Sequence, residues 1–434
     1  MKVAIVGGGV AGIAAAYTLL QDERVSAVHL LEATGRYGGR ACTDTTSIPG
    51  FAFDKGAQYI QDPTRNPLTG IAERLGFETV EEDADYRLRV ETEDGWQTLP
   101  TGEPAVQEVV DGIQLSFDAN SRQPNLIVAG KPRRTDDVEL FGHATSPYGP
   151  FTESAETWQY IAADRAREAP GDGKPNLFVK KGIGSLVAAW GQQLRPTFGS
   201  AYSEHFGAVV SRIVHDDERV TLTYGGNSLT VDACIITVPV SVLGNDRIAF
   251  EPALPQGHRD ALKVLRLGSY KKLALRLRTS PDDIVPGTNY YLAEDSPPGV
   301  WQCYRLPHAD DVLVAHAAGN FAEALDQFAD SRVFDMFKAR VQTAFDGVFF
   351  TNGRAITNWS HDPAAGGAYS YSAFIGGGPE DPMALRARRA LAAPVKRLRF
   401  AGEATDTACY GTLQAAYFSG EEAALDLLRD GGAA

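Results

Sequence analysis

The sequence predicts an α/β fold in which one domain, built on a parallel sheet, is assembled from separated stretches of chain and interleaved with a second, α+β domain. The first 32 residues show a strand, helix, strand pattern. Further strands are expected between residues 208 and 243, and a strand followed by a helix ends the chain. At 434 residues the chain is about three times the ~150 residues typical of one domain, which leaves room for both domains.

Each stretch has its own pattern. Residues 3–6 are a short apolar run of the kind a buried parallel strand needs, and it ends in glycine. An alanine-rich helix and a second strand follow, then a hairpin around a Gly-Gly turn, an apolar strand, and a final strand and helix. Their predicted ranges are 10–20, 28–31, 219–224 with 228–231, 233–238, 398–401 and 412–429.

The stretches between these elements are less regular and contain many prolines and acidic residues. We therefore expect the acidic run 81–85 to be a solvated loop, with a patch that steers cations as the alternative. The first domain is assigned to residues 1–75, 200–265 and 360–434. The second is assigned to residues 76–199 and 266–359.

Composition excludes several classes of protein. The chain has 41 basic and 55 acidic residues and a net charge of −14, which disfavours nucleic acid as a partner and suits cationic small molecules. The apolar start is rich in glycine and lacks a cleavage site, so no signal peptide is expected, and no run is long enough for a membrane helix. The four cysteines are widely scattered and the histidines show no metal-binding spacing, so neither disulfides nor a metal site is expected. This cysteine usage predicts a cytoplasmic location.

The first turn carries the motif Gly7-x-Gly9-x-x-Gly12, and Glu32 ends the next strand 20 residues after Gly12. In this pattern the glycines allow a tight turn, a close approach to a pyrophosphate and close packing of helix on strand. The helix N-terminus offers amide donors to phosphates, and the acid can bind ribose hydroxyls. The motif predicts a dinucleotide site and leaves NAD and FAD open.

Residues 32–40, Glu-Ala-Thr-Gly-Arg-Tyr-Gly-Gly-Arg, resemble the extension that flavoproteins of the amine oxidase superfamily carry after the ribose-binding acid. Four further stretches resemble that family in the same order, over most of the chain: 54–60, 181–186, 233–243 and 400–420. The resemblance to this superfamily, with monoamine and polyamine oxidases as members, implies a Rossmann-like FAD-binding domain of the GR2 type. It also implies that the α+β domain binds the substrate.

The resemblance implies a set of FAD contacts, in which Val210 touches the adenine, Glu403 holds the ribityl chain and the helix after Thr412 directs its positive end at the flavin. Ala368 stands where monoamine oxidases have the cysteine linked to flavin, so non-covalent FAD is expected. The expected cofactor-binding residues are Gly7, Gly9, Gly12, Glu32, Ala33, Gly39, Arg40, Gly56, Ala57, Gln58, Tyr59, Val210, Trp359, Gly402, Glu403, Gly411 and Thr412.

Three positions concern catalysis. Lys272 corresponds to the lysine that amine oxidases hold through a water to flavin N5, and an ordinary surface lysine is the alternative. Tyr369 matches one wall of the aromatic cage that faces the amine, with simple core packing as the alternative. Thr412 stands where the second cage tyrosine lies in monoamine oxidases, so the cage is half open, as in the histone demethylase and some polyamine oxidases.

The activity that the resemblance implies is oxidation of an amine. A hydride passes from the carbon beside the nitrogen to flavin N5, the imine hydrolyses, and molecular oxygen returns the flavin with release of hydrogen peroxide. The partners expected are therefore a small-molecule amine and oxygen. The identity of the amine, its class as primary or secondary, and the oligomeric state are left open, with a homodimer as one option.

Several alternatives remain. An L-amino-acid oxidase shares the fold, but Gln58 and Tyr59 stand where such enzymes tend to carry a carboxylate-binding arginine. An FAD-dependent desaturase or dehydrogenase would leave Lys272 and Tyr369 without a purpose. A histone demethylase is disfavoured because the chain starts directly at the first strand and shows no long heptad-bearing insertion. Outside enzymes, a flavin-bound interaction module without turnover is the alternative.

Overall fold

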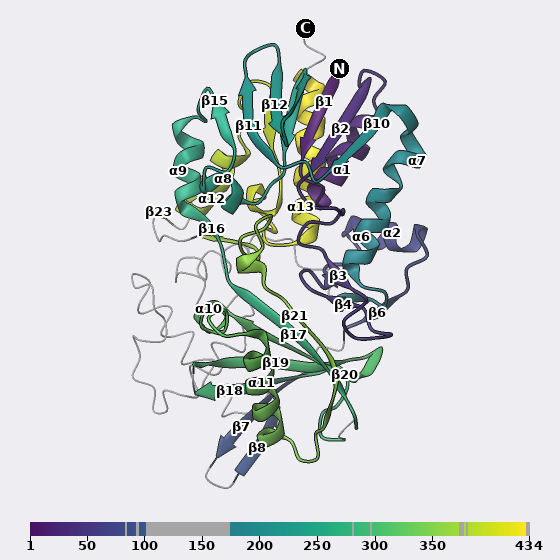
Figure 1. Cartoon of the computed structure of the whole chain (residues 1–434), viewed down its shortest axis with the longest axis vertical. Helices are drawn as coiled ribbons and strands as arrows, with labels where there is room; N and C mark the ends of the chain where they lie inside the picture. Colours follow the sequence, from purple (N-terminus) through teal and green to yellow (C-terminus); the bar gives the residue numbers. More distant parts are fainter. Residues whose placement is uncertain are drawn as a thin grey trace.

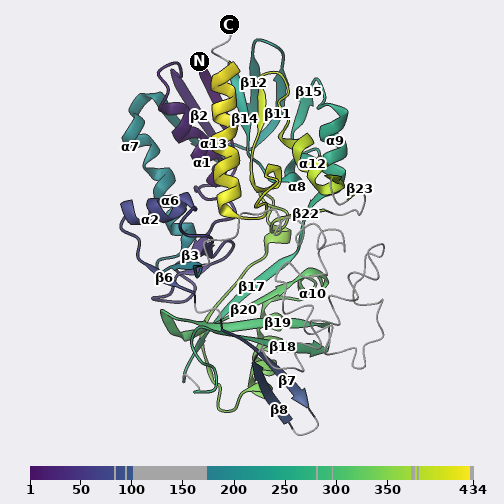
Figure 2. The ribbon, with the colours of Figure 1, turned by 180° about the vertical axis from the view of Figure 1, so that it is seen from behind.

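The computed structural model describes residues 1–82, 85–92, 95–100, 174–279, 282–295, 297–372, 377–378 and 381–430. One region is built on a five-stranded parallel sheet and the other on a seven-stranded sheet (Figures 1 and 2). Strands from the start, middle and end of the chain lie together in the parallel sheet, which confirms the predicted interleaved α/β fold. The exact segment boundaries stay a prediction, and residues 101–173 of the segment 76–199 lie outside the described residues.

The parallel sheet brings distant stretches side by side in the order β10-β2-β1-β14-β25, and each neighbouring pair is parallel. Its predicted strands are confirmed, although the strand expected over 233–238 ends at Ile236. The strands are β1 (Lys2–Val6), β2 (Ala27–Glu32), β10 (Tyr202–Phe206), β14 (Ala233–Ile236) and β25 (Leu398–Phe400).

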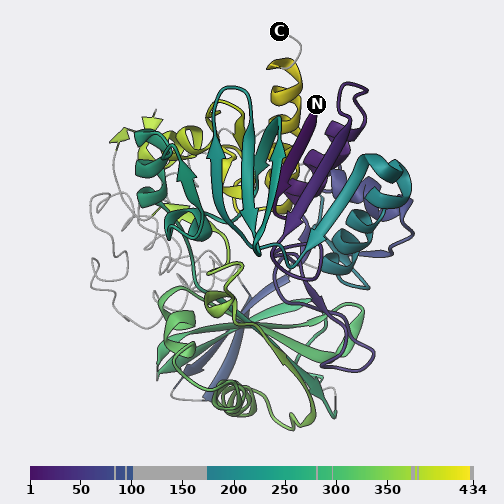
Figure 3. The ribbon, with the colours of Figure 1, turned by 45° about the horizontal axis from the view of Figure 1, so that its top comes forward.

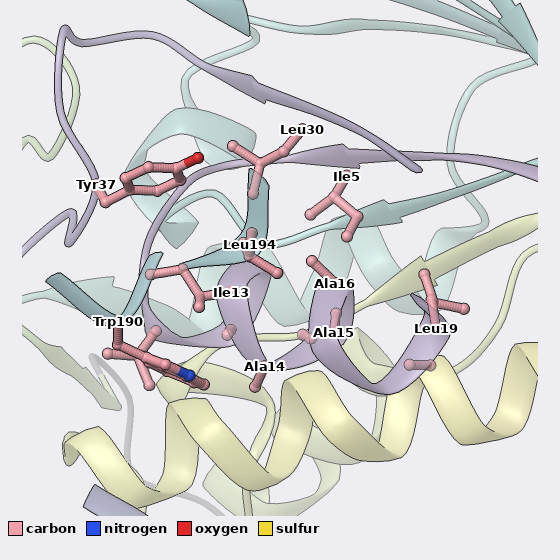
Figure 4. Close-up of a cluster of buried hydrophobic side chains, with 14 of the residues drawn as sticks. Ile5, Ile13, Ala14, Ala15, Ala16, Leu19, Leu30, Tyr37, Trp190 and Leu194 are labelled. Carbon is pink, nitrogen blue, oxygen red and sulfur yellow. The ribbon is translucent and has the colours of Figure 1, made fainter. Parts of the chain in front are cut away.

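Successive residues of a strand point to opposite faces of the sheet, so every second residue can pack against helices on one face. Val3 and Ile5 of β1 pack into a core with the helices, whereas Ala4 and Val6 pack on the opposite face. In Figure 4 the alanines of one helix lie between Ile5 and Leu30 of the sheet and the neighbouring helices. The helices of this core are α1 (Val10–Leu20), α2 (Pro67–Arg74), α6 (Ile183–Gln192), α7 (Leu194–Phe198) and α13 (Leu413–Asp430).

Helices α1 and α13 approach each other closely through small residues. A Cβ at Gly420 of α13 would lie 2.1 Å from the carbonyl oxygen of Ala11 in α1. A side chain at this position would therefore push the two helices apart. Since α13 also begins beside the nucleotide motif, this packing fixes both helix N-termini at the same edge of the sheet.

The other face of the parallel sheet packs on a four-stranded sheet of order β13-β12-β11-β15 and on three helices. Its predicted hairpin is confirmed: Gly225 and Gly226 form the turn, with φ values of 49° and 82°. The elements are β11 (Val210–His215), β12 (Val220–Tyr224), β13 (Asn227–Val231), β15 (Ala249–Glu251), α8 (Val240–Gly244), α9 (Gln256–Val264) and α12 (Met383–Ala392).

The second region is a seven-stranded sheet of order β21-β17-β20-β19-β18-β7-β8, with two helices packed on one face (Figure 3). The expectation that residues 266–359 are irregular was wrong, because the prolines and acids there fall mainly at strand ends. The elements are β7 (Asp85–Thr92), β8 (Gly95–Pro100), β17 (Tyr270–Leu277), β18 (Thr288–Asp295), β19 (Pro298–Leu306), β20 (Ala309–Ala318), β21 (Phe350–Ile356), α10 (Gly319–Leu325) and α11 (Asp330–Ala344).

Short elements complete the described chain: α2 (Pro67–Arg74) and the strands β3 (Thr43–Asp44), β4 (Phe53–Asp54), β5 (Tyr59–Ile60), β6 (Thr79–Glu81), β9 (Leu177–Val179), β16 (Leu265–Leu267), β22 (Ser370–Ser372), β23 (Gly377–Gly378) and β24 (Asp381–Pro382). Three 3₁₀ turns are η2 (Gly199–Ala201), η3 (Trp359–His361) and η4 (Glu403–Thr405). Within these described elements, no helix has the length and apolar character needed to cross a membrane.

In the described part of the acidic run 81–85, Glu82 is not solvated, in contrast to the loop that the sequence predicted. Glu81 is exposed at the end of β6, but Glu82 is buried, with 9% of its surface exposed. Its backbone amide donates to the carbonyl of Asn176, which continues the pairing of β6 with β9 and turns the side chain inward. Residues 83 and 84 lie outside the described part of the chain.

Candidate active site

A cavity of about 780 Å³ lies where the parallel sheet meets the seven-stranded sheet. This volume is in the range of cofactor and small-molecule sites. Every site residue predicted from the sequence lines it except Gly12, where a Cβ would lie 2.0 Å from the carbonyl oxygen of Gly7. The predicted lining residues are Gly7, Gly9, Glu32, Ala33, Gly39, Arg40, Gly56, Ala57, Gln58, Tyr59, Val210, Lys272, Trp359, Tyr369, Gly402, Glu403, Gly411 and Thr412.

One end of the cavity lies at the start of α1. The helix begins after Gly9, whose own side-chain position is open to the cavity: a Cβ there would meet no described atom closer than 4.0 Å. Glu32 is buried beside it, and its carboxylate accepts bonds from the amide of Gly8 at 2.7 Å and from the amide and hydroxyl of Thr34 at 2.8 and 2.7 Å. A carboxylate can accept about four hydrogen bonds, so room remains for a ligand hydroxyl. The partner Thr34 was not predicted.

Glu403 connects three parts of the chain. One carboxylate oxygen accepts from Arg40 at 2.8 Å and from the amide of Ser370 at 3.2 Å, and the other accepts from the Ser370 hydroxyl at 2.6 Å and from Gly411 at 3.0 Å. Burial acts to raise the pKa of Glu403, but Arg40 and Arg388 outweigh it and the net shift is downward. With its acceptor capacity used, this carboxylate organises the cavity wall.

Sequence reasoning missed Arg388 and Tyr410, which lie behind the Glu403 carboxylate. Arg388 is 1% exposed and donates to the Ser370 hydroxyl and to the carbonyl of Ala404, at 2.8 and 2.9 Å. Its guanidinium lies 3.7 Å from the centre of the Tyr410 ring. A buried arginine inside the short helix α12 carries no motif, so only its position in the fold shows the connection to Glu403.

Lys272 lies on β17 and is 2% exposed, so it is not the surface lysine of the alternative reading. Its ammonium donates to the carbonyls of Asp54, at 2.6 Å, and Gly56, at 3.1 Å, which leaves one hydrogen for the cavity. Burial lowers the pKa of Lys272 to about 7, against the charge of Asp54, which raises it. Lys271 faces the other way and pairs with Asp326 at 2.6 Å, as the alternation of a strand requires.

Tyr369 and Thr412 lie at the same end of the cavity. The ring of Tyr369 stands 6.1 Å from that of Tyr270, at an angle of 56°. The Thr412 hydroxyl donates to the carbonyl of Cys409 and accepts from the amide of Ala415, so it caps α13. Trp359 also lines this end and donates from its indole nitrogen to the carbonyl of Lys55 at 2.8 Å.

A group of hydrogen-bonded side chains that was not predicted forms part of the wall. The imidazole of His316 bonds to the hydroxyls of Tyr270, at 2.7 Å, and Tyr304, at 3.0 Å. Tyr270 could have been suspected, because it lies two residues before Lys272 on the same face of a strand. His316 pairs with Lys272 across the sheet, a relation that the sequence alone does not show.

Comparison with known protein families decides which class of site this is. The model of the family described as flavin containing amine oxidoreductase matches residues 10–106 and 159–428. The chain belongs to this family. As a flavin-containing amine oxidoreductase it is an FAD-dependent enzyme that acts on CH–NH donors.

Individual relatives agree with this assignment. Polyamine oxidase 2 of Arabidopsis thaliana is 28% identical, over 98% of this chain and 87% of the relative. Polyamine oxidase 4 of Oryza sativa subsp. japonica is 26% identical, over 98% and 88%. Lysine-specific histone demethylase 1 homolog 1 of Arabidopsis thaliana is 26% identical over 99% of this chain, but only 52% of the relative is covered.

Solved structures share the fold. Cyclohexylamine oxidase from Brevibacterium oxydans IH-35A superimposes with a TM-score of 0.77 at 20% identity, with 99% of both chains covered. Wild-type putrescine oxidase bound to putrescine superimposes with a TM-score of 0.73 at 19% identity, again over 99% of both chains. At this level of identity the comparison supports the architecture of the flavin-containing amine oxidoreductases and not a particular substrate.

The cavity of this amine oxidoreductase fits FAD on its own geometry. The N-termini of α1 and α13 both open into it, and such termini stabilise negative charge. No described side chain caps the α1 terminus at Gly9, so its first amides are available to a pyrophosphate. Among the described residues, no cluster of metal-binding side chains occurs.

Proposed function

We propose that the chain is an FAD-dependent amine oxidase that removes a hydride from the carbon beside an amine nitrogen and yields an imine. The observation that supports this most strongly is the convergence, in one cavity, of the dinucleotide-binding glycines with Lys272 and Tyr369. The imine then hydrolyses to an aldehyde or ketone. When bound, FAD supplies the hydride acceptor, and molecular oxygen reoxidises it with release of hydrogen peroxide.

The side chains of the cavity have separate tasks in this proposal. Lys272 uses its remaining ammonium hydrogen to hold a water. This water lies near flavin N5, where the substrate carbon beside the amine nitrogen must approach. Tyr369 faces the amine with its ring and excludes water from it. Because Thr412 is committed to capping α13, the opposite wall of the cage stays open to larger substituents.

We further propose that FAD is bound without a covalent bond. Ala368 offers only a methyl group at the position of the flavin-linked cysteine in monoamine oxidases. None of the four cysteines is among the described residues that line the cavity. Acid precipitation of the protein is therefore expected to leave the yellow cofactor in the supernatant, and a coloured pellet would contradict this.

An L-amino-acid oxidase is less well supported. Gln58 occupies the position of the expected arginine and donates to the Tyr304 hydroxyl. Arg40, the nearest candidate in sequence, is already bonded to Glu403 and to the carbonyl of Ala368 at 2.8 and 2.6 Å. The first position therefore offers a substrate carboxylate no arginine, and the arginine at the second is already bonded to other groups. The cytoplasmic location and a homodimer stay predictions.

The test is a substrate panel under anaerobic conditions. The holoenzyme is mixed with monoamines, polyamines and L-amino acids, and the absorbance of oxidised flavin is followed. We expect bleaching by at least one amine and slower or no bleaching by the amino acids. Bleaching by amino acids alone would replace the proposal by the amino-acid oxidase, and a flavin that stays oxidised throughout would favour an interaction module.

A further inference from the structure

The stretch 181–186 carries a family resemblance but no predicted site residue, and it lies at the start of α6. Two side chains from another segment bind the first amides of this helix. The carboxylate of Asp54 on β4 accepts from the amides of the first two residues, at 3.0 and 3.2 Å. The hydroxyl of Thr43 on β3 accepts from the amide of the third at 2.9 Å and donates to Asp54 at 2.6 Å. The start of α6 is therefore capped from outside, by the paired strands β3 and β4.

Close packing holds this cap in place. A Cβ at Gly182, the residue before α6, would lie 2.3 Å from Cγ2 of Thr43 and 2.9 Å from the carboxylate of Asp54. Gly182 also has a φ of 84°, which glycine adopts without strain. Because this residue has no side chain, Asp54 and Thr43 can reach the amides of the helix. The Asp54 carboxylate is thus held by three donors and cannot move without uncapping α6.

The main chain of Asp54 binds Lys272 on β17. The Asp54 carbonyl accepts from the Lys272 ammonium at 2.6 Å, and the carbonyl of Gly56 accepts from the same ammonium at 3.1 Å. The ring of Phe53, the other residue of β4, has its centre 5.8 Å from the ammonium nitrogen. Asp54 therefore joins the start of α6, through its side chain, to Lys272, through its backbone.

We propose that Asp54 is a positioning residue for Lys272. Its carboxylate, held at the start of α6, fixes the Asp54 carbonyl against the Lys272 ammonium, and the third ammonium hydrogen then stays directed into the cavity. The inference rests on the proposed amine oxidase function, in which Lys272 uses this hydrogen, and it adds the group that sets the direction of the hydrogen. Asp54 acts through Lys272, because it is not among the described residues that line the cavity.

The charge of Asp54 supports the same state of the lysine. Asp54 and Lys272 are 8% and 2% exposed. Burial lowers the pKa of Lys272 and the charge of Asp54 raises it, whereas burial raises the pKa of Asp54 to about 6 against the bond from Thr43 and the charge of Lys272. A neutral lysine would use both of its hydrogens on the two carbonyls and have none for the cavity. The protonated lysine is therefore the form that Asp54 favours and that the proposed reaction uses.

Two further titratable groups face this pair. His316 on β20 pairs with Lys272 across the sheet, and burial and the charge of Lys272 lower its pKa well below the usual value, so it is neutral. Tyr304 on β19 is close enough to Asp54 to feel its charge, and burial raises the pKa of Tyr304 above the usual value, so it is neutral as well. Among the described residues, Asp54 is therefore the charged group that acts on Lys272.

The direct test follows the titration of Lys272 in Asp54→Asn. The holoenzyme is labelled with lysine that carries ¹³C at Cε, the Lys272 signal is assigned through Lys272→Met, and its chemical shift is followed with pH by NMR. Asparagine keeps the size of the side chain, but it removes the charge and turns an NH₂ group toward the donors of α6. We expect the pKa of Lys272 to fall by about one unit or more, as loss of a nearby opposite charge does. An unchanged titration would overturn the proposal.

The matched control is Asp44→Asn. Asp44 lies on β3 of the same strand pair, and its carboxylate also accepts from backbone amides and hydroxyls, but these belong to its own turn, at Thr46 and Ser47. This variant should leave the titration of Lys272 unchanged, and a shift equal to that of Asp54→Asn would count against a specific role of Asp54.

A second pair of variants applies if Asp54→Asn does not fold. Thr43→Val keeps the Asp54 carboxylate but removes the hydroxyl that donates to it. The pKa of Asp54 should rise further, so less of its charge remains near pH 7 and the pKa of Lys272 should fall, by less than in Asp54→Asn. Thr43→Ser retains the hydroxyl and should follow the wild type. Identical titrations of Lys272 in the valine and serine variants would overturn the proposal.

The kinetic test separates positioning from a merely structural cap. Flavin reduction by benzylamine, cyclohexylamine, putrescine and spermine, and reoxidation by oxygen, are followed by stopped flow from pH 6 to 9. At each pH the rate of Lys272→Met is subtracted. The remaining rate of the wild type should be lost as pH rises through about 7, and that of Asp54→Asn should be lost at lower pH.

The outcomes separate the inference from the function. A loss by the same factor at every pH in Asp54→Asn would indicate only a structural cap and overturn the proposal. Equal rates of wild type and Lys272→Met in both half-reactions would remove the lysine from the mechanism and the positioning role with it. If no probe amine reduces the wild type, the proposed function fails, while the titration of Lys272 still tests whether Asp54 controls this lysine.

Discussion

Lys272 shows what a single residue contributes beyond its motif. In the folded protein its ammonium is held by the carbonyls of Asp54 and Gly56 and has one hydrogen left for the cavity. We expect Lys272→Met to retain FAD and to slow flavin reduction or reoxidation roughly tenfold or more, measured by stopped flow. Lys271→Met is the control: it should destabilise the protein by leaving Asp326 unpaired and buried, but leave the rate of reduction unchanged. Equal rates in wild type and Lys272→Met would remove this lysine from the mechanism.

The lowered pKa of Lys272 also predicts a pH dependence of stability. Lysine in the unfolded chain has a pKa of 10.5, against about 7 in the folded protein. Between these values the unfolded state binds a proton that the folded state does not, so the free energy of unfolding should rise with pH. Urea unfolding at pH 7, 8 and 9 should show a smaller rise in Lys272→Met. An identical slope would mean that the buried ammonium keeps its ordinary pKa.

Glu403 predicts the opposite behaviour on the acid side. Its pKa is lowered by Arg40 and Arg388 despite burial, so its contribution to stability is present above the unfolded value of 4.5 and is lost as pH falls. Glu403→Gln should cost about 3 kcal/mol at pH 7, because Arg40 loses its partner, and the difference should shrink toward pH 4. The midpoint of thermal unfolding of the holoenzyme at each pH measures this. A constant difference would show that the carboxylate is not ionised in the folded state.

At the residue scale, the sequence predicts the residues that carry a local pattern and misses those that act through the fold. Gly7, Gly9 and Glu32 are found because their spacing repeats a known geometry. Glu82 looked like part of a solvated acidic run, and only its pairing with Asn176 turns it inward. Arg388, His316 and Tyr304 have no spacing that relates them to the site.

At the scale of the elements, periodicity predicted α1 and the hairpin well. The seven-stranded sheet was missed, although most of its strands lie in residues 266–359. Its strand β17 is buried almost throughout, including both lysines, so it lacks the clear alternation that marks a half-exposed strand. Pairing between distant strands, and not local sequence, defines this sheet.

The packing of α1 on α13 gives a prediction for the elements. Gly420→Ala places a methyl group against the carbonyl of Ala11 and should destabilise the protein by about 1–3 kcal/mol. Gly70→Ala is the matched control, since Gly70 is also helical, in α2, and has no atom within 4 Å of its Cβ position. That change should be neutral or stabilise by up to about 1 kcal/mol. Equal effects of the two substitutions would mean that α13 can move away from α1 without loss.

At the scale of the whole molecule, the net charge proved less informative than the sequence suggested. Among the residues that the structure describes, acidic and basic side chains line the cavity in similar number, so this lining does not itself favour a cationic substrate. Amine recognition is instead assigned to the aromatic wall that Tyr369 forms in the cavity. The charged lining residues are Glu32, Arg36, Arg40, Lys55, Glu82, Arg247, Lys272, Asp362 and Glu403.

The central claim is that this cavity oxidises an amine by transferring a hydride to bound FAD. A single anaerobic turnover tests it most directly: the holoenzyme is mixed with the best amine of the panel, and the reduced flavin and the carbonyl product are measured together. We predict full bleaching of the oxidised flavin with one aldehyde or ketone formed per flavin. Bleaching without a carbonyl product, or oxidised flavin that persists with every amine, would contradict the account.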